Sequence, residues 1–320
     1  MSCAIIIVMP LDLLTIGDSA IDLYMRISDT ELDPYQGKVC FFHGTKIMVN
    51  SFESAVAGNA VNVALGCAKL GVKTGIYTEL GNDQNAKLVI QILKNGRVGI
   101  KTVVINKGKM TNVHPIIVFG TDRTIFSYHE KFNYKITKWP QTKWIYYTSL
   151  AENFPEFQAK LIEHVKRTGT GLAMNPGTVH MKAGIDKLKN VFSITDILIV
   201  NREEAIKLTE LHYDSNVSEI HNHLHKLGPK LTVITDGKNG ATAKDVTGKF
   251  EQRQIYEIAH KPVDNKTGAG DAFSAGFMSA IIHGKSMKEA LKWGTINSSY
   301  AIREVGANKG LLSLKEIEKL

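Results

Sequence analysis

The chain has 320 residues, of which 43% are hydrophobic and 22% are charged, a composition typical of globular proteins with a large core. Its formal net charge is +8, but the lysines and arginines are spread along the chain without an interleaved aromatic run, which argues against a nucleic-acid partner. The N-terminal apolar stretch is short, lacks a basic region and is interrupted by Pro10 and Asp12, so we expect no signal peptide and no membrane association. The three cysteines, Cys3, Cys40 and Cys67, form no CxxC pair, which favours a reducing, cytoplasmic location.

Short apolar runs alternate with amphipathic segments along the whole chain. Runs rich in Ile, Val and Leu predict buried, largely parallel strands at residues 13–16, 74–78, 172–175, 197–200 and 231–235. Apolar residues at helical spacing predict helices at residues 60–70, 83–94, 157–167, 217–227 and 286–302. This alternation predicts a three-layer α/β/α fold with right-handed crossovers.

Two stretches interrupt the alternation, at about residues 24–52 and 110–134. Both show the period-2 pattern of half-buried strands, as in HPIIVF and RTIFSYH, and neither leads into a strong helix pattern. We expect them to form a small β-sheet lid inserted in one domain of residues 1–320. Alternatively, they are additional strands of the main sheet.

A glycine-rich turn with one acid precedes a helix pattern in TGAGDAFSAGFM. Phe273, Phe277 and Ile281 share one helix face, which places Asp271 in or beside the first helical turn. Free backbone N–H groups and the helix dipole favour negative charge at this end, and Gly268 and Gly270 allow an anion to approach closely. The turn therefore suits phosphoryl transfer, with Asp271 as the base, although it is not a Walker A loop. The alternative is that Asp271 only caps the helix.

This turn resembles the C-terminal signature of the ribokinase-like (PfkB) carbohydrate kinase family, and further segments match in the family's order along nearly the whole chain. The resemblance implies a ribokinase-like fold and an ATP-dependent sugar kinase. It also implies that Asp271 is the catalytic base, with Gly268, Ala269 and Gly270 as the anion hole for the transferred phosphoryl group.

Two N-terminal segments resemble the family's acceptor-binding motifs. In LLTIGDSAIDLYMRI, Asp22 lies where the family has a carboxylate that binds sugar hydroxyls, a task for which a double acceptor is suited. In AGNAVNVALGCAKLG, Gly58 and Asn62 match substrate-contacting positions, whereas Ala57 replaces the usual first glycine of a pair. Taken alone, Asp22 is more simply interpreted as a surface carboxylate at a strand end. The alternative for the second segment is a helix start capped by Asn59, which is compatible with substrate contact.

Segments in the C-terminal half resemble the family's nucleotide-binding motifs. LIVNREEA matches an N-x-x-E motif, which implies that Asn201 and Glu204 organise magnesium and the phosphates, largely through water. Two further segments resemble those that surround ATP in the family. LTVITDGKNGATA implies nucleotide contacts at Thr235, Gly237 and Gly240, and INSSYAIREVGANKGLL implies contacts at Asn297 and Gly306. The alternatives are a capping box at Asn201 and a simple hairpin after Thr235.

One departure from the family pattern concerns potassium. The residue six before the catalytic acid is often Asp in this family, and here it is Asn265, with Asp264 beside it. The resemblance links this position to a monovalent cation site, so loss of a carboxylate weakens the expectation of K⁺ activation.

These observations predict an ATP- and Mg²⁺-dependent kinase for a hydroxyl of a small molecule. Free sugars such as ribose or fructose rank first as acceptor, nucleosides second, and sugar phosphates third, for which Arg123, Lys46 or His114 could bind the phosphate. The rivals are a non-catalytic sugar or nucleotide sensor and a nicotinamide-dependent Rossmann enzyme, although GDSAID lacks the G-x-G-x-x-G spacing. The lid could also serve as a homodimer surface.

Overall fold

The computed structural model describes residues 10–28, 33–35, 38–120, 122–258, 267–304, 306 and 309–320, and Cys3, Asp264 and Asn265 lie outside these ranges. Its main sheet has the strand order β15-β14-β13-β12-β11-β10-β1-β6-β7. The pairs from β13 to β7 are parallel, and β14 and β15 are antiparallel additions. The strand bounds are β1 Leu11–Ile16, β6 Thr74–Gly81, β7 Gly99–Asn106, β10 Thr142–Tyr147, β11 Gly171–Met174, β12 Ile197–Asn201, β13 Leu231–Thr235, β14 Ala241–Asp245 and β15 Phe250–Arg253.

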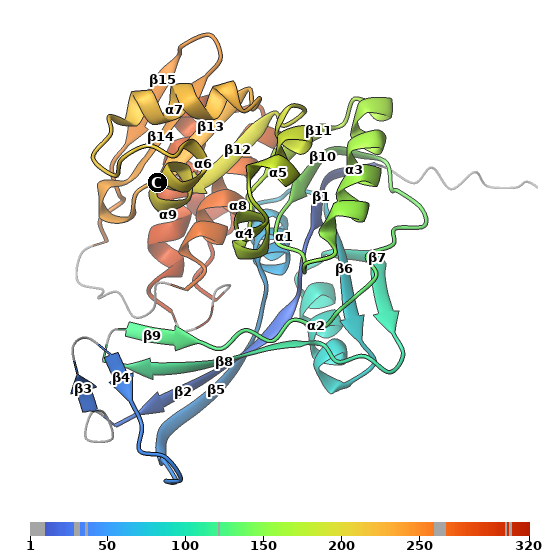
Figure 1. Cartoon of the computed structure of the whole chain (residues 1–320). Coiled ribbons are helices and arrows are strands. Elements are labelled where there is room, and N and C mark those ends of the chain that lie inside the picture. The colour runs from blue at the N-terminus through green and yellow to red at the C-terminus, as the bar shows by residue number, and fades with distance from the viewer. Residues whose placement is uncertain are drawn as a thin grey trace, which may run out of the picture.

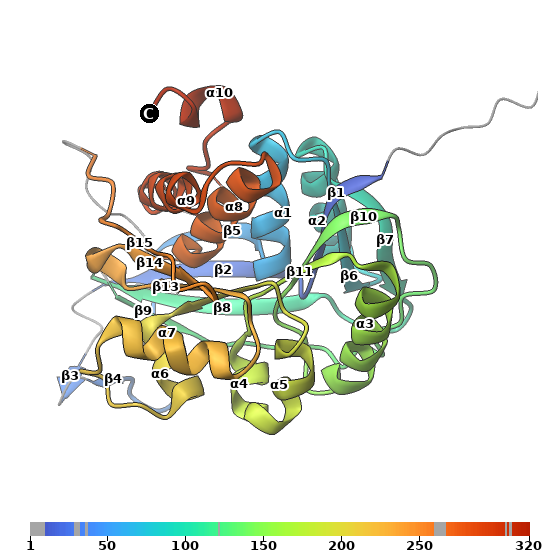
Figure 2. The same cartoon turned by 90° about the horizontal axis from the view of Figure 1, so that it is seen from above.

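Helices cover both faces of this sheet, as Figure 2 shows in the view from above. On one face lie α1 (Asn59–Lys69), α2 (Gln84–Asn95), α8 (Ala269–Ile282), α9 (Met287–Ala301) and α10 (Leu314–Ile317). On the other lie α3 (Phe154–Thr168), α4 (Thr178–Ala183), α5 (Ile185–Phe192), α6 (Arg202–Thr209) and α7 (Val217–Lys226). The prediction of a three-layer α/β/α fold is confirmed.

Alternate residues of the central strands supply two separate hydrophobic cores. Leu13 and Tyr146 pack with the α1, α8 and α9 side, whereas Leu14 and Tyr147 pack with the α3 to α7 side, and all four are fully buried. Burial of one such side chain stabilises the fold by roughly 1.5–3 kcal/mol. The strands therefore read as continuous apolar runs because both faces are covered.

A second, four-stranded sheet, which we call the lid sheet, projects from the main body (Figure 1). Its order is β5-β2-β8-β9, with bounds β2 Ala20–Ile27, β5 Val49–Ala57, β8 Asn112–Phe119 and β9 Asp122–Ile125. A small hairpin of β3 (Asp33–Tyr35) and β4 (Lys38–Cys40) lies between β2 and β5 in the sequence. These strands form a sheet of their own and do not extend the main one, and β2 begins earlier than the stretch at residues 24–52 suggested.

None of the helices in the described part of the chain is both long and apolar enough to cross a membrane.

Candidate active site

The start of α8 is built by a left-handed glycine. Gly268 caps the helix with φ of 80°, a conformation that favours glycine, and α8 begins at Ala269. A side-chain carbon added at Gly270 would meet no protein atom within 4 Å. The first turn of α8 therefore presents backbone N–H groups to open space, which is the arrangement that binds anions.

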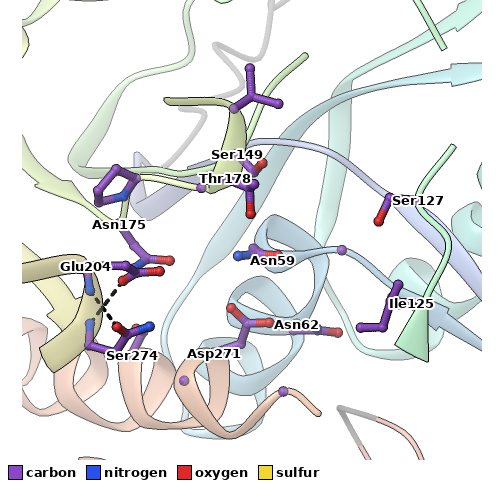
Figure 3. Close-up of a pocket in the computed structure, with 18 of the residues that line it drawn as sticks. Asn59, Asn62, Ile125, Ser127, Ser149, Asn175, Thr178, Glu204, Asp271 and Ser274 are labelled. Carbon is purple, nitrogen blue, oxygen red and sulfur yellow. Dashed lines mark hydrogen bonds between the residues drawn. The ribbon is translucent and has the colours of Figure 1, made fainter. Parts of the chain in front are cut away.

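Asp271 lies in this first turn and faces a cavity (Figure 3). Its Oδ2 atom accepts a hydrogen bond of 2.8 Å from Nδ2 of Asn62, although the two residues are 209 positions apart in the sequence. Withdrawal from bulk water raises the pKa of the Asp271 carboxyl to about 7, the Asn62 hydrogen bond opposes this, and the charges of Asp22 and Glu204 add to it. A carboxyl group with such a pKa can exchange a proton near neutral pH.

Asn62 reaches Asp271 because of the turn before α1. Gly58 has φ of 108°, and a side chain there would collide with the backbone carbonyl oxygen of Asp18. The chain turns at this glycine from β5 into α1, whose first residues line the same cavity at Asn59 and Asn62. Figure 3 shows Asn59 directed into the space above Asp271.

Asp22 belongs to the lid sheet and is 4% exposed. Tyr24 donates a 3.1 Å hydrogen bond from its hydroxyl group to Oδ2 of Asp22. Oδ1 of Asp22 lies 3.1 Å from Nδ1 of His114 on the neighbouring strand β8. The carboxylate is thus held by two side chains while it faces the cavity.

The cavity, which we call the lid cavity, has a volume of about 880 Å³ between the lid sheet and the carboxyl ends of the central strands. It brings together ten of the site residues identified in the sequence, and Ala57 lines it as well. The ten are Asp22, Gly58, Asn62, Asn201, Glu204, Thr235, Gly268, Ala269, Gly270 and Asp271. In Figure 3, Ile125 and Ser127 of the lid side lie opposite Glu204 and Ser274, with Asp271 between them.

A second cavity of about 760 Å³, the α9 cavity, adjoins the first. It is lined by the turn after β13, with Gly237 and Gly240, and by apolar side chains that include Tyr256, Phe273 and Ile302. Thr235, Ala269 and Gly270 line both cavities. The anion-binding turn of α8 therefore lies where the two cavities meet.

Asn201 and Glu204 form a capping box at the start of α6. The Glu204 backbone N–H donates to Oδ1 of Asn201 (2.8 Å), and the Asn201 N–H donates to Oε2 of Glu204 (3.0 Å). Burial raises the pKa of the Glu204 carboxyl above its usual value. One carboxylate oxygen remains without a capping partner, and the described residues hold no cluster of three or more metal-binding side chains. This set fits Mg²⁺, which keeps several waters and takes few protein ligands beside phosphates.

Two of the identified residues line neither cavity within the described chain. Asn297 is fully buried, donates to the carbonyl oxygen of Ala272 (2.8 Å) and accepts from the N–H of Leu312 (3.1 Å), so it connects α9 to α8. Gly306 is buried near Ala55 and Lys309, with φ of 103°. The structure gives both residues packing roles, and their nucleotide contacts stay predictions.

Several lining residues escaped the sequence interpretation. They follow the carboxyl ends of β10 and β11 or lie in the lid: Ser149, Glu152, Asn175, Thr178, Lys182, Ser127 and His129. Asn175 follows β11 directly, and its Nδ2 donates to the carbonyl oxygen of Ile199 (2.8 Å). The signal that could have found them is the rule that ligands bind at the carboxyl ends of parallel strands.

The two cavities meet at a helix N-terminus suited to binding anions, and the chain belongs to the pfkB family of carbohydrate kinases, whose family model matches residues 13–313. The protein is therefore a phosphotransferase with an alcohol group as acceptor, and the suspected family membership is confirmed.

Relatives within this family differ in their acceptors. The chain is 25% identical to an ATP-dependent 6-phosphofructokinase of Thermoanaerobacterium thermosaccharolyticum, over 97% of this chain and 93% of the relative. It is 24% identical to a nucleoside kinase of Methanothermobacter thermautotrophicus, over 96% and 94% of the two chains. The structure of Arabidopsis thaliana ribokinase complexed with ribose and ATP superposes with a TM-score of 0.79 at 22% identity, covering 97% of this chain and 98% of that one.

Proposed function

We propose that this protein transfers the γ-phosphoryl group of ATP to a hydroxyl group of a free sugar or a sugar-like molecule. The observation that carries the proposal is the position of the first turn of α8, with Asp271, at the junction of the lid cavity and the α9 cavity. Phosphoryl transfer requires a nucleophile in line with the phosphoryl group and compensation of the charge on its oxygens. Two cavities that meet at an anion-binding turn supply both.

In this proposal Asp271 accepts the proton of the attacking hydroxyl. Its raised pKa makes it a base that acts near neutral pH, and Asn62 holds the carboxylate in place. The backbone N–H groups of residues 268–270 would bind the transferred group, since Gly270 leaves space for it. Asp22, Gly58 and Asn62 would orient the acceptor in the lid cavity.

The nucleotide would occupy the α9 cavity, whose apolar side chains suit a flat heteroaromatic base. Thr235, Gly237 and Gly240 would lie along its phosphates and ribose, with the phosphate end directed to Gly270. Glu204 and Asn201 would hold Mg²⁺ through water, and the ion would offset the negative charge of the triphosphate.

The lid sheet would exclude water from the reacting groups. Asp22, His114, Ile125 and Ser127 come from the lid side of the cavity, and the remaining wall comes from the core. Closing the space between them around an acceptor favours transfer to its hydroxyl over hydrolysis of ATP.

A nucleoside is the second candidate acceptor. The lid cavity has room for a ribosyl group with a base, and Ile125 adds an apolar surface at the lid end. A sugar phosphate ranks third, and a sensor without catalysis is the remaining alternative.

We also propose that the lid sheet mediates homodimerisation. Strand β5 is an edge strand of this sheet, and large apolar side chains on and before it are exposed: Phe41, Phe42, Met48, Val49 and Phe52. Exposed edges with apolar side chains are usually covered by a partner. Light scattering after size exclusion would detect a dimer, and Phe42→Ser with Phe52→Ser should convert it to a monomer. A monomeric wild-type protein at micromolar concentration contradicts this proposal.

The kinase proposal is tested by ADP release from ATP and Mg²⁺ with pentoses, hexoses, their phosphates and nucleosides as acceptors. We expect release that depends on one acceptor, together with formation of its phosphate ester. A protein that binds ATP but phosphorylates none of these compounds would favour the sensor and leave Asp271 as a helix cap.

A further inference from the structure

A pair of side chains on neighbouring lid strands forms one corner of the lid cavity. Asp22 and His114 are register partners in the parallel pairing of β2 with β8, so their side chains lie side by side. Nδ1 of His114 is 3.1 Å from Oδ1 of Asp22, and the Tyr24 hydroxyl donates to Oδ2. Both carboxylate oxygens are therefore fixed, and each keeps a lone pair for a further donor.

The surroundings of His114 indicate which nitrogen carries the proton. Nε2 of His114 is buried and has no hydrogen-bond partner among the described residues. A proton on Nε2 would thus be a buried donor without an acceptor, whereas a proton on Nδ1 is donated to Asp22. The arrangement favours a ring that carries a proton on Nδ1 and donates it to Asp22.

The Asp22 carboxylate has one cationic neighbour on the lid, Arg123, whose charge acts on the Tyr24 hydroxyl but which does not line the lid cavity. The ring of His129 lies 5.3 Å from that of His114, but Nδ1 of His129 is directed to Asp18, at 3.5 Å from its Oδ2. Asp18 in turn accepts a hydrogen bond from the Tyr134 hydroxyl (2.9 Å).

Carboxyl groups outnumber basic side chains along the rest of the cavity. The described lining residues include four carboxyl groups, those of Asp22, Glu152, Glu204 and Asp271, and one lysine, Lys182, which is exposed. The Nε atom of Arg123 is buried without a hydrogen-bond partner among the described residues, but Arg123 is not part of this lining. Phosphate groups are usually bound by arginine forks or lysine clusters, and carboxylates repel them.

We propose that His114 is a positioning residue that orients the Asp22 carboxylate toward hydroxyl groups, and that this pair selects an uncharged, hydroxyl-bearing acceptor over its phosphorylated counterpart. The inference rests on the proposed kinase function, whose acceptor class it names. Each free lone pair of Asp22 accepts one acceptor hydroxyl, and an anionic group in the same corner would be placed against the carboxylate.

Binding rather than turnover tests the inference. Calorimetry with Mg²⁺ and a non-hydrolysable ATP analogue at saturation keeps the nucleotide site filled. The probes are three matched pairs: D-ribose and ribose 5-phosphate, D-fructose and fructose 6-phosphate, and adenosine and its 5′-monophosphate. We expect at least one uncharged member to bind, with an affinity at least about tenfold higher than that of its phosphate, the factor that one hydrogen bond or one charge contact typically supplies.

Two variants separate orientation of Asp22 from simple packing of the ring. His114→Asn keeps a donor at the position of Nδ1 and should retain acceptor affinity within about threefold, whereas His114→Leu keeps apolar bulk, removes the donor and should weaken acceptor binding about tenfold. Affinity for the ATP analogue should stay unchanged in both, which also reports that the variants are folded. A role in packing alone would give the opposite order, because Leu preserves volume better than Asn.

Three results would overturn the inference: tighter binding of a phosphorylated member, wild-type affinity in His114→Leu, or no binding of any uncharged probe. Failure of the kinase function is recognised separately. An uncharged probe that binds with the expected His114 dependence but yields no ADP with ATP contradicts the kinase proposal and leaves the His114 assignment in place.

Discussion

The two cavities that meet at α8 differ in their walls. The lid cavity is lined by carboxyl, amide and hydroxyl side chains from both the lid and the core. The α9 cavity is lined mainly by backbone turns and apolar side chains, among them Ile255, Tyr256 and Phe273. Hydroxyl groups of a small molecule require individual polar partners, whereas a flat base requires apolar surface and backbone contacts. The contrast suggests that side-chain chemistry determines the acceptor and that loop shape determines the nucleotide.

The largest expected effect is on catalysis in the lid cavity, without an effect on nucleotide binding in the α9 cavity. Asp271→Asn should lower kcat by about two to four orders of magnitude, because the base is lost, and should leave ATP affinity nearly unchanged. Steady-state kinetics and ATP calorimetry measure the two quantities. Asp214→Asn, at an exposed loop position, serves as the matched control and should behave as the wild-type protein. Turnover near the wild-type rate in folded Asp271→Asn would refute the assignment of the base.

Gly270→Ala should affect both cavities at their junction. The added methyl group meets no protein atom and occupies the space where the phosphoryl group would bind. We expect kcat/KM to fall about 10- to 100-fold, as for overpacking by one methyl group, with unchanged or higher thermal stability. Gly99→Ala on strand β7 is the control, since its methyl group makes only ordinary contacts. Wild-type kcat/KM in Gly270→Ala would show that the phosphoryl group does not bind beside Gly270.

The pH dependence should originate in the lid cavity. Asp271 must be ionised to accept a proton, and its pKa in the free protein is about 7. The value of kcat/KM should therefore fall about tenfold per pH unit below 7. A flat profile between pH 5.5 and 8 would contradict the role of Asp271. Binding of Mg²⁺ should shift the acidic fall of kcat/KM to lower pH, because a nearby positive charge favours the ionised carboxylate of Asp271.

The smallest expected effect concerns stability. The folded-state pKa of Asp271 is above its unfolded value near 3.8, so folding binds a proton between these values, and the carboxyl group lowers the free energy of unfolding progressively as pH rises from about 4 to about 7. Asp271→Asn removes this penalty. Its melting temperature should exceed that of the wild type by several °C at pH 8, and the difference should shrink as the pH falls toward about 4, where Asp271 becomes protonated in both the folded and the unfolded state. Equal melting temperatures at pH 8 would show that ionisation of Asp271 does not destabilise the folded protein.

Much of the main sheet could be predicted because doubly covered strands are continuous apolar runs, as in Ile197–Asn201 and Leu231–Thr235. Strand β10 was missed although Ile145, Tyr146 and Tyr147 are fully buried. Its sequence, TKWIYY, is aromatic, carries hydroxyl groups and lacks the Val and Leu of the other runs. Ser149, which follows this strand into the lid cavity, was missed for the same reason.

Residues of the candidate site could be predicted where they belong to a short local motif. Asp271 and its glycines lie in one turn, so spacing alone indicates them. The pairing of Asp22 with His114 joins residues 92 positions apart and depends on the register of β2 against β8. A shift of one residue would direct these side chains to opposite faces, and no local pattern determines which register forms.

Two of the connections between the lid sheet and the core are very short. Residues 17–19 separate β1 from β2, and Gly58 alone separates β5 from α1. The two connections touch, since a side chain at Gly58 would collide with Asp18. The proposed acceptor side chains Asp22 and His114 thus lie on strands of a different sheet from the turn that carries Asp271. Substitutions on β2 and β8 can therefore change one wall of the lid cavity without altering the sequence of that turn.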